Sequence, residues 1–158
     1  MSVQTRFFHV TIASLWAGDI IQPGRFGTTL RQFRPGGPYP SANDLGTVLW
    51  ELALESARQS IDPELPSRLD CVFACTTFAD AAFFRSNFKR DGSILEVELV
   101  HPESRLHHGC FGILASYKSS EPYMDFLPQA ARRYWTDKPT GAAEVVVGGP
   151  LRVVGPAE

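Results

Sequence analysis

The sequence has few cysteines and no long apolar run, and each shortage excludes a class of protein. Its 158 residues include three cysteines, Cys71, Cys75 and Cys110, whose spacing matches no common zinc or redox motif. An odd, small number argues against a disulfide-stapled fold and favours small buried side chains in a reducing compartment. No apolar run approaches the ~20 residues that cross a bilayer, so we expect no membrane partner.

The sequence also lacks an excess of charge of either sign. Fifteen Lys and Arg stand against 17 Asp and Glu, and the resulting net charge of -2 gives no sign of a broadly basic nucleic-acid surface. A local basic groove stays open. The opening residues MSVQTRFFHV lack the apolar segment of a signal peptide, so we expect a cytoplasmic protein, or one delivered into a target cell's cytoplasm by a dedicated system.

The length predicts a single domain over residues 1–158, and its strands are predicted from composition and alternation. The clearest pattern is the period-two alternation at residues 94–100, which is typical of a half-buried strand. Aromatic and β-branched residues, short apolar runs and Gly-Pro turns predict the others, at residues 3–12, 69–75, 143–147 and 151–154.

Three helices are expected, at about 44–60, 78–88 and 124–135, the last kinked or divided at Pro128. In the first, an apolar stripe is predicted to face inward, which leaves its charged residues in solvent. The stripe is Val48, Leu49, Leu52, Ala53 and Ala57, and the charged residues are Glu51, Glu55 and Arg58. In the second, the residues predicted to pack inward are Ala79, Ala82 and Phe83.

Residues 23–43 are rich in proline, glycine and arginine and are predicted to form a long loop, which is either functional or disordered. The helices and strands alternate along the chain, but no glycine-rich phosphate turn follows the first strand. A mixed α+β sheet is therefore expected, and not a doubly wound parallel one.

Two polar residues stand out because they lie in apolar strands. His9 occurs in FFHVT and Glu144 precedes three valines. Taken alone, each is as readily a hydrogen-bonded core histidine or a strand carboxylate pointing to water. The pair His107-His108 is expected in a solvated loop. Arg132 to Trp135 mixes charge with aromatic rings as nucleic-acid readers do, although a tyrosine and a tryptophan near a helix end are more often packed.

Five segments together resemble the ADP-ribosyltransferase superfamily: FFHVT, LWAGDIIQPGRFG, CVFACTTFADAAFF, ARRYW and AAEVVVGGPLRVVG. The opening resembles both the small rifamycin-inactivating ADP-ribosyltransferases and the DNA-modifying ADP-ribosyltransferase toxins. AAEVVV is similar to the segment that supplies the catalytic glutamate in those toxins. Residues 35–66 and 102–122 carry no such resemblance. The resemblance implies a split β-sheet with flanking helices.

The resemblance also assigns roles. His9 would hydrogen-bond the adenosine-side ribose of NAD⁺, and Thr11, on the same strand face, would contact the cofactor. Phe73 stands where many relatives have a tyrosine that stacks on nicotinamide, so the ring face is kept and the hydroxyl is lost. Glu144 corresponds to the catalytic glutamate.

Two arginines are candidates for the cofactor phosphates, Arg25 in the glycine-rich segment and Arg68 before the second strand. Cleavage of the nicotinamide-ribose bond builds positive charge on the ribose, which a fixed carboxylate stabilises. NAD⁺ would thus be a substrate, and no metal is expected.

The expected activity is mono-ADP-ribosyl transfer from NAD⁺ to a macromolecule, protein or nucleic acid, as in a toxin or a phage or anti-phage effector with an antitoxin partner. Three alternatives stay open: transfer to a small molecule such as an antibiotic, NAD⁺ hydrolysis, and an inactive NAD-binding module. The net charge of -2 favours the small-molecule acceptor over a nucleic acid.

Overall fold

The strands form two separate antiparallel sheets in the computed structural model, which describes residues 5–37, 42–115 and 120–157. The four-stranded sheet has the order β1-β4-β7-β2, and the three-stranded sheet has the order β3-β6-β5. The protein is therefore of the α+β class with a split sheet, as predicted. The bounds are β1 Arg6–Thr11, β2 Ile20–Ile21, β3 Val72–Ala74, β4 Ser93–Leu99, β5 Leu106–Cys110, β6 Ala143–Val147 and β7 Leu151–Pro156.

The two sheets pack together through one core cluster and meet at one short bridge. Buried residues of β1, β4 and β7 pack against those of β3 and β6; Phe7, Val97 and Val145 are at most 1% exposed. At the bridge, the Phe8 and Cys75 backbones exchange two hydrogen bonds, of 2.8 and 2.7 Å. The sheets are thus fastened at Phe8 without becoming one continuous sheet.

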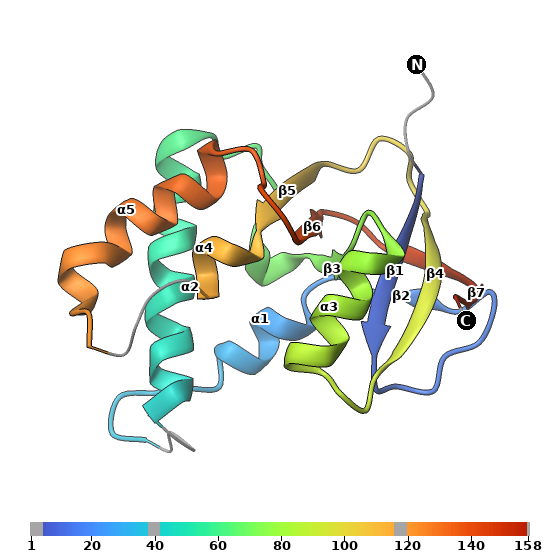
Figure 1. The fold of residues 1–158 in the computed structure, drawn as a ribbon, viewed down its shortest axis with the longest axis horizontal. Helices are drawn as coiled ribbons and strands as arrows, with labels where there is room; N and C mark the ends of the chain where they lie inside the picture. The colour runs from blue at the N-terminus through green and yellow to red at the C-terminus, as the bar shows by residue number, and fades with distance from the viewer. Residues whose placement is uncertain (1–4, 38–41, 116–119, 158) are drawn as a thin grey trace.

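Helices cover the other face of the three-stranded sheet. The bounds are α1 Arg25–Leu30, α2 Ala42–Ile61, α3 Phe78–Phe88, α4 Phe111–Ala115 and α5 Tyr123–Thr136, with a 3-10 turn η1 at Arg68–Asp70. Helices α2 and α5 lie side by side at one end of the molecule, opposite β1, β4 and β7 (Figure 1). None of the helices in the described ranges is both long and apolar enough to cross a membrane.

Strand β6 has core on both faces, which explains its unbroken run of valines. Val145 and Val147 join the cluster between the sheets, and Val146 joins the cluster under α2 and α5. All three are 0% exposed. A strand that is covered on both sides requires a continuous apolar run. Glu144 is therefore a charged residue in a strand whose following residues are all apolar and buried.

Two segments were predicted wrongly. Residues 23–43 are not one long loop, because they contain α1 and the start of α2; residues 38–41 lie outside the described part. The predicted solvated loop at His107-His108 is part of β5, and α4 follows it; no helix or strand was predicted at either place. The local sequence does not predict β5; the strand forms because it pairs with β6 along its whole length.

The inward faces of α2 and α3 were predicted correctly only in part: Ala53 and Ala57 of α2 and Ala82 of α3 pack against core clusters. In α2, Leu52 is 62% exposed while Glu51 and Arg58 are buried, because both charged side chains find partners in the interior. In α3, Ala81 is buried and Phe83 is exposed. Buried polar groups that are fully hydrogen-bonded thus displace apolar side chains from the expected face.

Helix α5 is one continuous helix across Pro128, so of the two predicted outcomes, a kink or two short pieces, the division into two pieces is wrong. Pro128 lies in the second turn, so it removes a single intrahelical hydrogen bond. The apolar face more than offsets that loss: Leu127, Ala130, Ala131, Tyr134 and Trp135 are all buried. The indole N–H of Trp135 donates to the Leu54 carbonyl of α2 at 2.8 Å.

Candidate functional site

A cavity of about 1070 Å³ opens where the two sheets separate. Its walls are mostly apolar and come from both sheets and from α1, so residues that are far apart in sequence meet there. All six residues predicted as site residues line it: His9, Thr11, Arg25, Arg68, Phe73 and Glu144.

The end of the strand pairing places Glu144 at this opening. Along β6, the partner strand β3 extends only from Val147 to Val145. Glu144 is one residue further and pairs only with Gly109 of β5 on the opposite side. The side chain therefore lies at the point where the sheet ends and the cavity begins, although the residue is only 4% exposed.

One oxygen of Glu144 is held and the other is open. Oε1 accepts hydrogen bonds from the Tyr134 hydroxyl and from Nη1 of Arg68. Oε2 has no hydrogen-bond or ion-pair partner among the described residues, and no buried side-chain nitrogen or oxygen there lacks a partner. Solvent must therefore reach Oε2, which leaves it free to contact a ligand.

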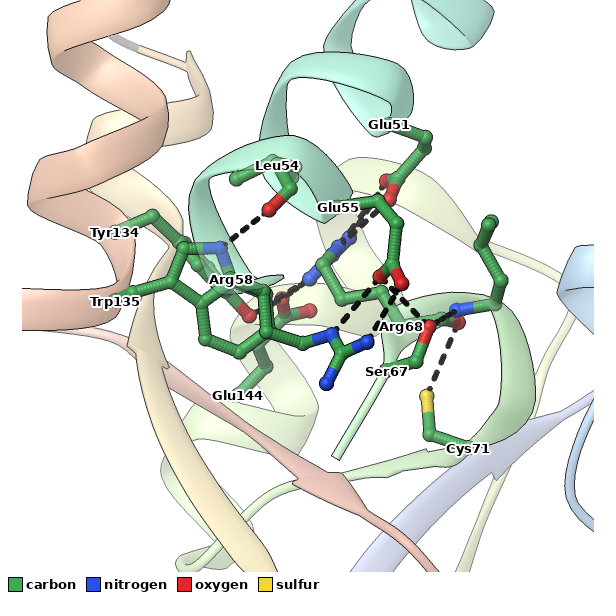
Figure 2. A network of polar contacts seen from close by, with 11 residues as sticks. Glu51, Leu54, Glu55, Arg58, Ser67, Arg68, Cys71, Tyr134, Trp135 and Glu144 are labelled. Carbon is green, nitrogen blue, oxygen red and sulfur yellow. Dashed lines mark hydrogen bonds and ion pairs between the residues drawn. The ribbon is translucent and has the colours of Figure 1, made fainter. Parts of the chain in front are cut away.

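Arg68 connects Glu144 to helix α2 (Figure 2). Its Nε and Nη2 each donate to Glu51 at 3.0 Å, and Nη1 also donates to the Tyr134 hydroxyl at 2.7 Å. Burial acts to lower the pKa of Arg68, but the charge of Glu144 first, then Tyr134 and Glu51, hold that pKa well above its usual value. This geometry favours a role in holding Glu144; the predicted contact of Arg68 with a pyrophosphate stays a prediction.

A second set of contacts fixes the position of the loop that precedes Arg68. The Arg58 guanidinium donates to Glu55 and to the carbonyls of Pro63 and Leu65, which fastens α2 to the following loop. The Ser67 hydroxyl donates to Glu55 at 2.9 Å and accepts from the backbone that opens η1. Figure 2 shows the contacts of Glu55 with Arg58 and Ser67 beside the Arg68 cluster. The orientation of Arg68 is thus set by α2 on both sides.

Tyr134 reaches Glu144 because Gly109 leaves room for its ring. A Cβ at position 109 would lie 2.2 Å from the Tyr134 ring. Burial raises the pKa of Tyr134 well above its usual value, so the hydroxyl stays protonated and donates to Glu144.

Gly109→Ala is therefore expected to destabilise the fold by about 1–3 kcal/mol, the usual cost of overpacking a core. Chemical denaturation measures the change. Gly155→Ala is the matched control, because a Cβ there meets nothing within 4 Å. Equal stability of the two variants would show that the Tyr134 ring moves aside freely.

His9 presents a neutral ring to the cavity. Its Nδ1 lies 2.7 Å from the Phe73 carbonyl, and because a carbonyl only accepts, Nδ1 carries the proton. Burial, with smaller contributions from the charges of Lys89 and Arg25, lowers the pKa of His9 despite that hydrogen bond. Nε2 is then an acceptor suited to a hydroxyl group.

Thr11 and Phe73 contribute surface more than hydrogen bonds. The Thr11 hydroxyl oxygen accepts from the Ala13 backbone at 3.1 Å. The Phe73 ring meets Phe26 edge-on at 5.4 Å, and the Arg68 guanidinium lies 4.7 Å over its centroid. One ring face is thus covered, so the predicted stacking on nicotinamide has only the other face available.

The charges lining the cavity are separated. Burial and the charge of Arg25 lower the pKa of Lys89, and both cations act on His9. No carboxylate pairs with Arg25 or Lys89 in the described ranges. The part of the cavity near His9 is therefore positively charged, through Arg25 and Lys89, and the carboxylate in the cavity lining is that of Glu144.

Three residues of this site were not anticipated: Glu51, Tyr134 and Lys89. Glu51 was assigned to the solvent face of its helix, yet Trp50, Leu54, Ala57 and Ile61 form an equally regular apolar stripe that turns Glu51 inward. Tyr134 was expected to be packed, and it is 0% exposed. No local pattern points to Lys89, because it reaches the site through the turn between α3 and β4.

Two other predicted features are structural. Tyr134 and Trp135 are both buried, so they offer no surface on which bases could stack. His107 packs its ring 4.6 Å from that of Trp135 and bonds the Tyr134 carbonyl at 3.0 Å, which corrects its predicted place in solvent.

The three cysteines are buried and unpaired, as their sequence context predicted. Burial raises the pKa of Cys75 to about 12 and that of Cys71 further, so the two thiols that line the cavity stay protonated and are poor nucleophiles. Within the described ranges, no group of three or more His, Cys, Asp or Glu side chains could hold a metal ion.

Residues 39–158 match the family model described as "Protein of unknown function (DUF2441)", which is most of the chain. The chain belongs to this family. In this DUF2441 protein, the matched segment contains Glu51, Arg68, Tyr134 and Glu144, whereas His9 precedes it. The buried carboxylate cluster thus lies wholly within the DUF2441 segment. No curated protein matches the chain.

Proposed function

We propose that this chain is an ADP-ribosyltransferase that uses NAD⁺ as its substrate, on an ADP-ribosyltransferase-like fold. One observation carries the proposal. His9 on the four-stranded sheet and Glu144 on the three-stranded sheet line one cavity at the split between the sheets, with Phe73 bonded to His9 and beside Arg68. These are residues to which the resemblance to the ADP-ribosyltransferase superfamily assigns roles in NAD⁺ binding and catalysis.

The charge pattern of the cavity suits a dinucleotide. NAD⁺ carries a negative diphosphate in its middle and a cationic pyridinium at one end. Arg25 and Lys89, both without a carboxylate partner in the described ranges, would attract the diphosphate. The open Oε2 of Glu144 would face the ribose next to the pyridinium.

The proposed reaction breaks the bond between nicotinamide and C1 of its ribose. The electron pair leaves with nicotinamide, which becomes neutral, and positive charge develops on the ribose. Oε2 of Glu144 stabilises that charge more than it stabilises bound NAD⁺, which lowers the barrier. A nucleophile of the acceptor then bonds to C1 and gives up its proton to solvent.

The acceptor is proposed to be a macromolecule, and the experiment must distinguish it from the alternatives. Because Tyr134 and Trp135 are buried, they cannot stack on bases, so they no longer argue for a nucleic-acid acceptor. The toxin or effector role, an antitoxin partner and a cytoplasmic site of action remain part of the proposal. Transfer to a small molecule is the alternative, which the largely apolar cavity favours.

The test is incubation with NAD⁺ labelled in its adenylate part, together with protein, DNA, RNA and antibiotic acceptors. The proposal expects nicotinamide release and label joined to one acceptor class. Release of free ADP-ribose with every acceptor would mean hydrolysis. Binding of NAD⁺ without nicotinamide release would identify a binding module and overturn the proposal.

His9→Ala is expected to lower the affinity for NAD⁺ by about 3- to 10-fold, the value of one hydrogen bond. The reason is that Nε2 would contact a ribose hydroxyl equally in the bound substrate and in the transition state. Calorimetric titration measures it, with His108→Ala as the control, since His108 is exposed on β5. Unchanged affinity in a folded His9→Ala variant would reduce His9 to a core residue.

A further inference from the structure

The buried cluster around Glu144 contains one more negative than positive charge. Glu51 and Glu144 each contribute one carboxylate, Arg68 contributes the single guanidinium, and their side chains are 7%, 6% and 8% exposed. The high pKa of Tyr134 keeps that hydroxyl neutral, so it does not alter the balance. A buried excess charge is costly unless it serves a purpose or is matched by a ligand.

The guanidinium of Arg68 makes unequal contacts with the two carboxylates. Its side edge, Nε and Nη2, contacts both oxygens of Glu51. Only Nη1 reaches Glu144, and it contacts Oε1 alone. Glu51 therefore receives the two-N–H pairing of the guanidinium and Glu144 a single contact, although the charge of Glu144 has the larger effect on the pKa of Arg68.

We propose that Glu51 is a positioning residue for the reaction at Glu144: by holding the paired N–H groups of Arg68, it limits how far that guanidinium offsets the negative charge that Oε2 presents to the cavity. This inference rests on the proposed function. Arg68 and Tyr134 would then fix the orientation of Glu144 through Oε1, while the charge of Glu51 offsets that of Arg68. Glu144 could thereby be held rigidly without losing the charge that the transition state requires.

The surroundings of Glu144 support this division of roles. The titratable groups that act on it or are acted on by it are Arg68 beside η1, Glu51 on α2, Tyr134 on α5, His107 on β5, and Cys71 and Cys75 at the two ends of β3. The thiols and the phenol are neutral at pH 7, and burial lowers the pKa of His107. Glu51 is therefore the source of negative charge that can offset Arg68.

Glu51→Gln tests the charge while keeping two of the three hydrogen bonds, because an amide oxygen at the Oε1 position still accepts from Nε and Nη2 of Arg68. We expect kcat to fall about ten-fold with KM changed less than two-fold, as befits an interaction felt mainly in the transition state. The acidic limb of the kcat profile should move to lower pH, because removing a neighbouring negative charge makes a carboxyl group easier to ionise. A purely structural Glu51 would leave that limb in place.

Glu55→Gln is the matched control. It removes one carboxylate from the same helix, and that carboxylate is paired with Arg58 and Ser67 and not with Arg68. It is expected to change stability without moving the acidic limb. If Glu51→Gln keeps the parent's kcat and pH profile, or if both variants move the limb equally, the proposal is wrong.

A second measurement separates failure of this inference from failure of the proposed function. Carboxyl carbon NMR follows the titration of Glu144 in the protein without any substrate. Glu51→Gln should lower the pH at which Glu144 is half-protonated, whether or not the parent consumes NAD⁺. A shift without NAD⁺ turnover in the parent would overturn the function alone; turnover in the parent without a shift would overturn the role of Glu51 alone.

Discussion

Glu144→Gln should reduce turnover of NAD⁺ by on the order of 10²–10³-fold, the range for removing one preorganised group that stabilises transition-state charge. NAD⁺ affinity should be nearly unchanged, because the carboxylate is needed mainly after positive charge has developed on the ribose. The amide oxygen can still accept from Arg68 and Tyr134, so the side chain keeps its place. Nicotinamide release under saturating NAD⁺ and calorimetric binding give the two quantities.

Glu98→Gln is a suitable control for that variant. Glu98 is a strand carboxylate paired with an arginine, as Glu144 is, but it pairs with Arg152 at the protein surface. It is expected to turn over like the parent. If Glu144→Gln also does so while remaining folded, Glu144 is only a structural member of the buried cluster and the ADP-ribosyltransferase proposal loses its catalytic group.

The strands that carry His9 and Glu144 were predictable because their local patterns are strong. Aromatic and β-branched residues mark β1, and three valines mark β6. Local sequence patterns do not predict that the two residues are close in space. His9 and Glu144 lie on different sheets and approach each other only because both sheets border the same cavity. The family resemblance assigned both residues to one expected site, and in the structure both line one cavity.

The cluster that holds Glu144 could not be predicted for a different reason. Amphipathic periodicity assumes that charged residues face water, and on that assumption Glu51 was assigned outward. The assumption fails when a buried arginine provides a partner, as Arg68 does here. Detecting such a pair requires knowing that η1 and α2 adjoin, which depends on the loop that Arg58 fastens.

Short elements were missed because neighbours define them more than composition does. Strand β2 has two residues and is ordered by pairing with β7. Helix α1 follows an N-cap glycine, Gly24, in the left-handed region at φ 100°. The helix packs so closely on η1 that a Cβ at Gly27 would lie 1.9 Å from the Leu69 carbonyl oxygen. This contact places Arg25 and Phe26 at the cavity, which no local propensity could indicate.

Arg68→Met is expected to cost about 3–5 kcal/mol of unfolding free energy at neutral pH, the usual effect of removing one partner from a buried ion pair. Methionine fills a similar volume, so the loss arises from charge: Glu51 and Glu144 would face each other with no cation between them. Urea denaturation measures the loss. Arg152→Met is the control, because Arg152 makes an exposed pair with Glu98, and such pairs contribute at most about 1 kcal/mol.

The pH dependence of Arg68→Met separates charge from packing. In the variant, two unpaired buried carboxylates bind protons more readily in the folded than in the unfolded state, so its deficit relative to the parent should shrink as the pH falls and grow as it rises. Adding Glu51→Gln to Arg68→Met should recover part of the loss, because it removes one of the two facing charges. A deficit that is constant with pH and unrelieved by Glu51→Gln would mean that Arg68 stabilises the fold through its packing on Phe73 and Tyr134, with the ion pairs contributing little.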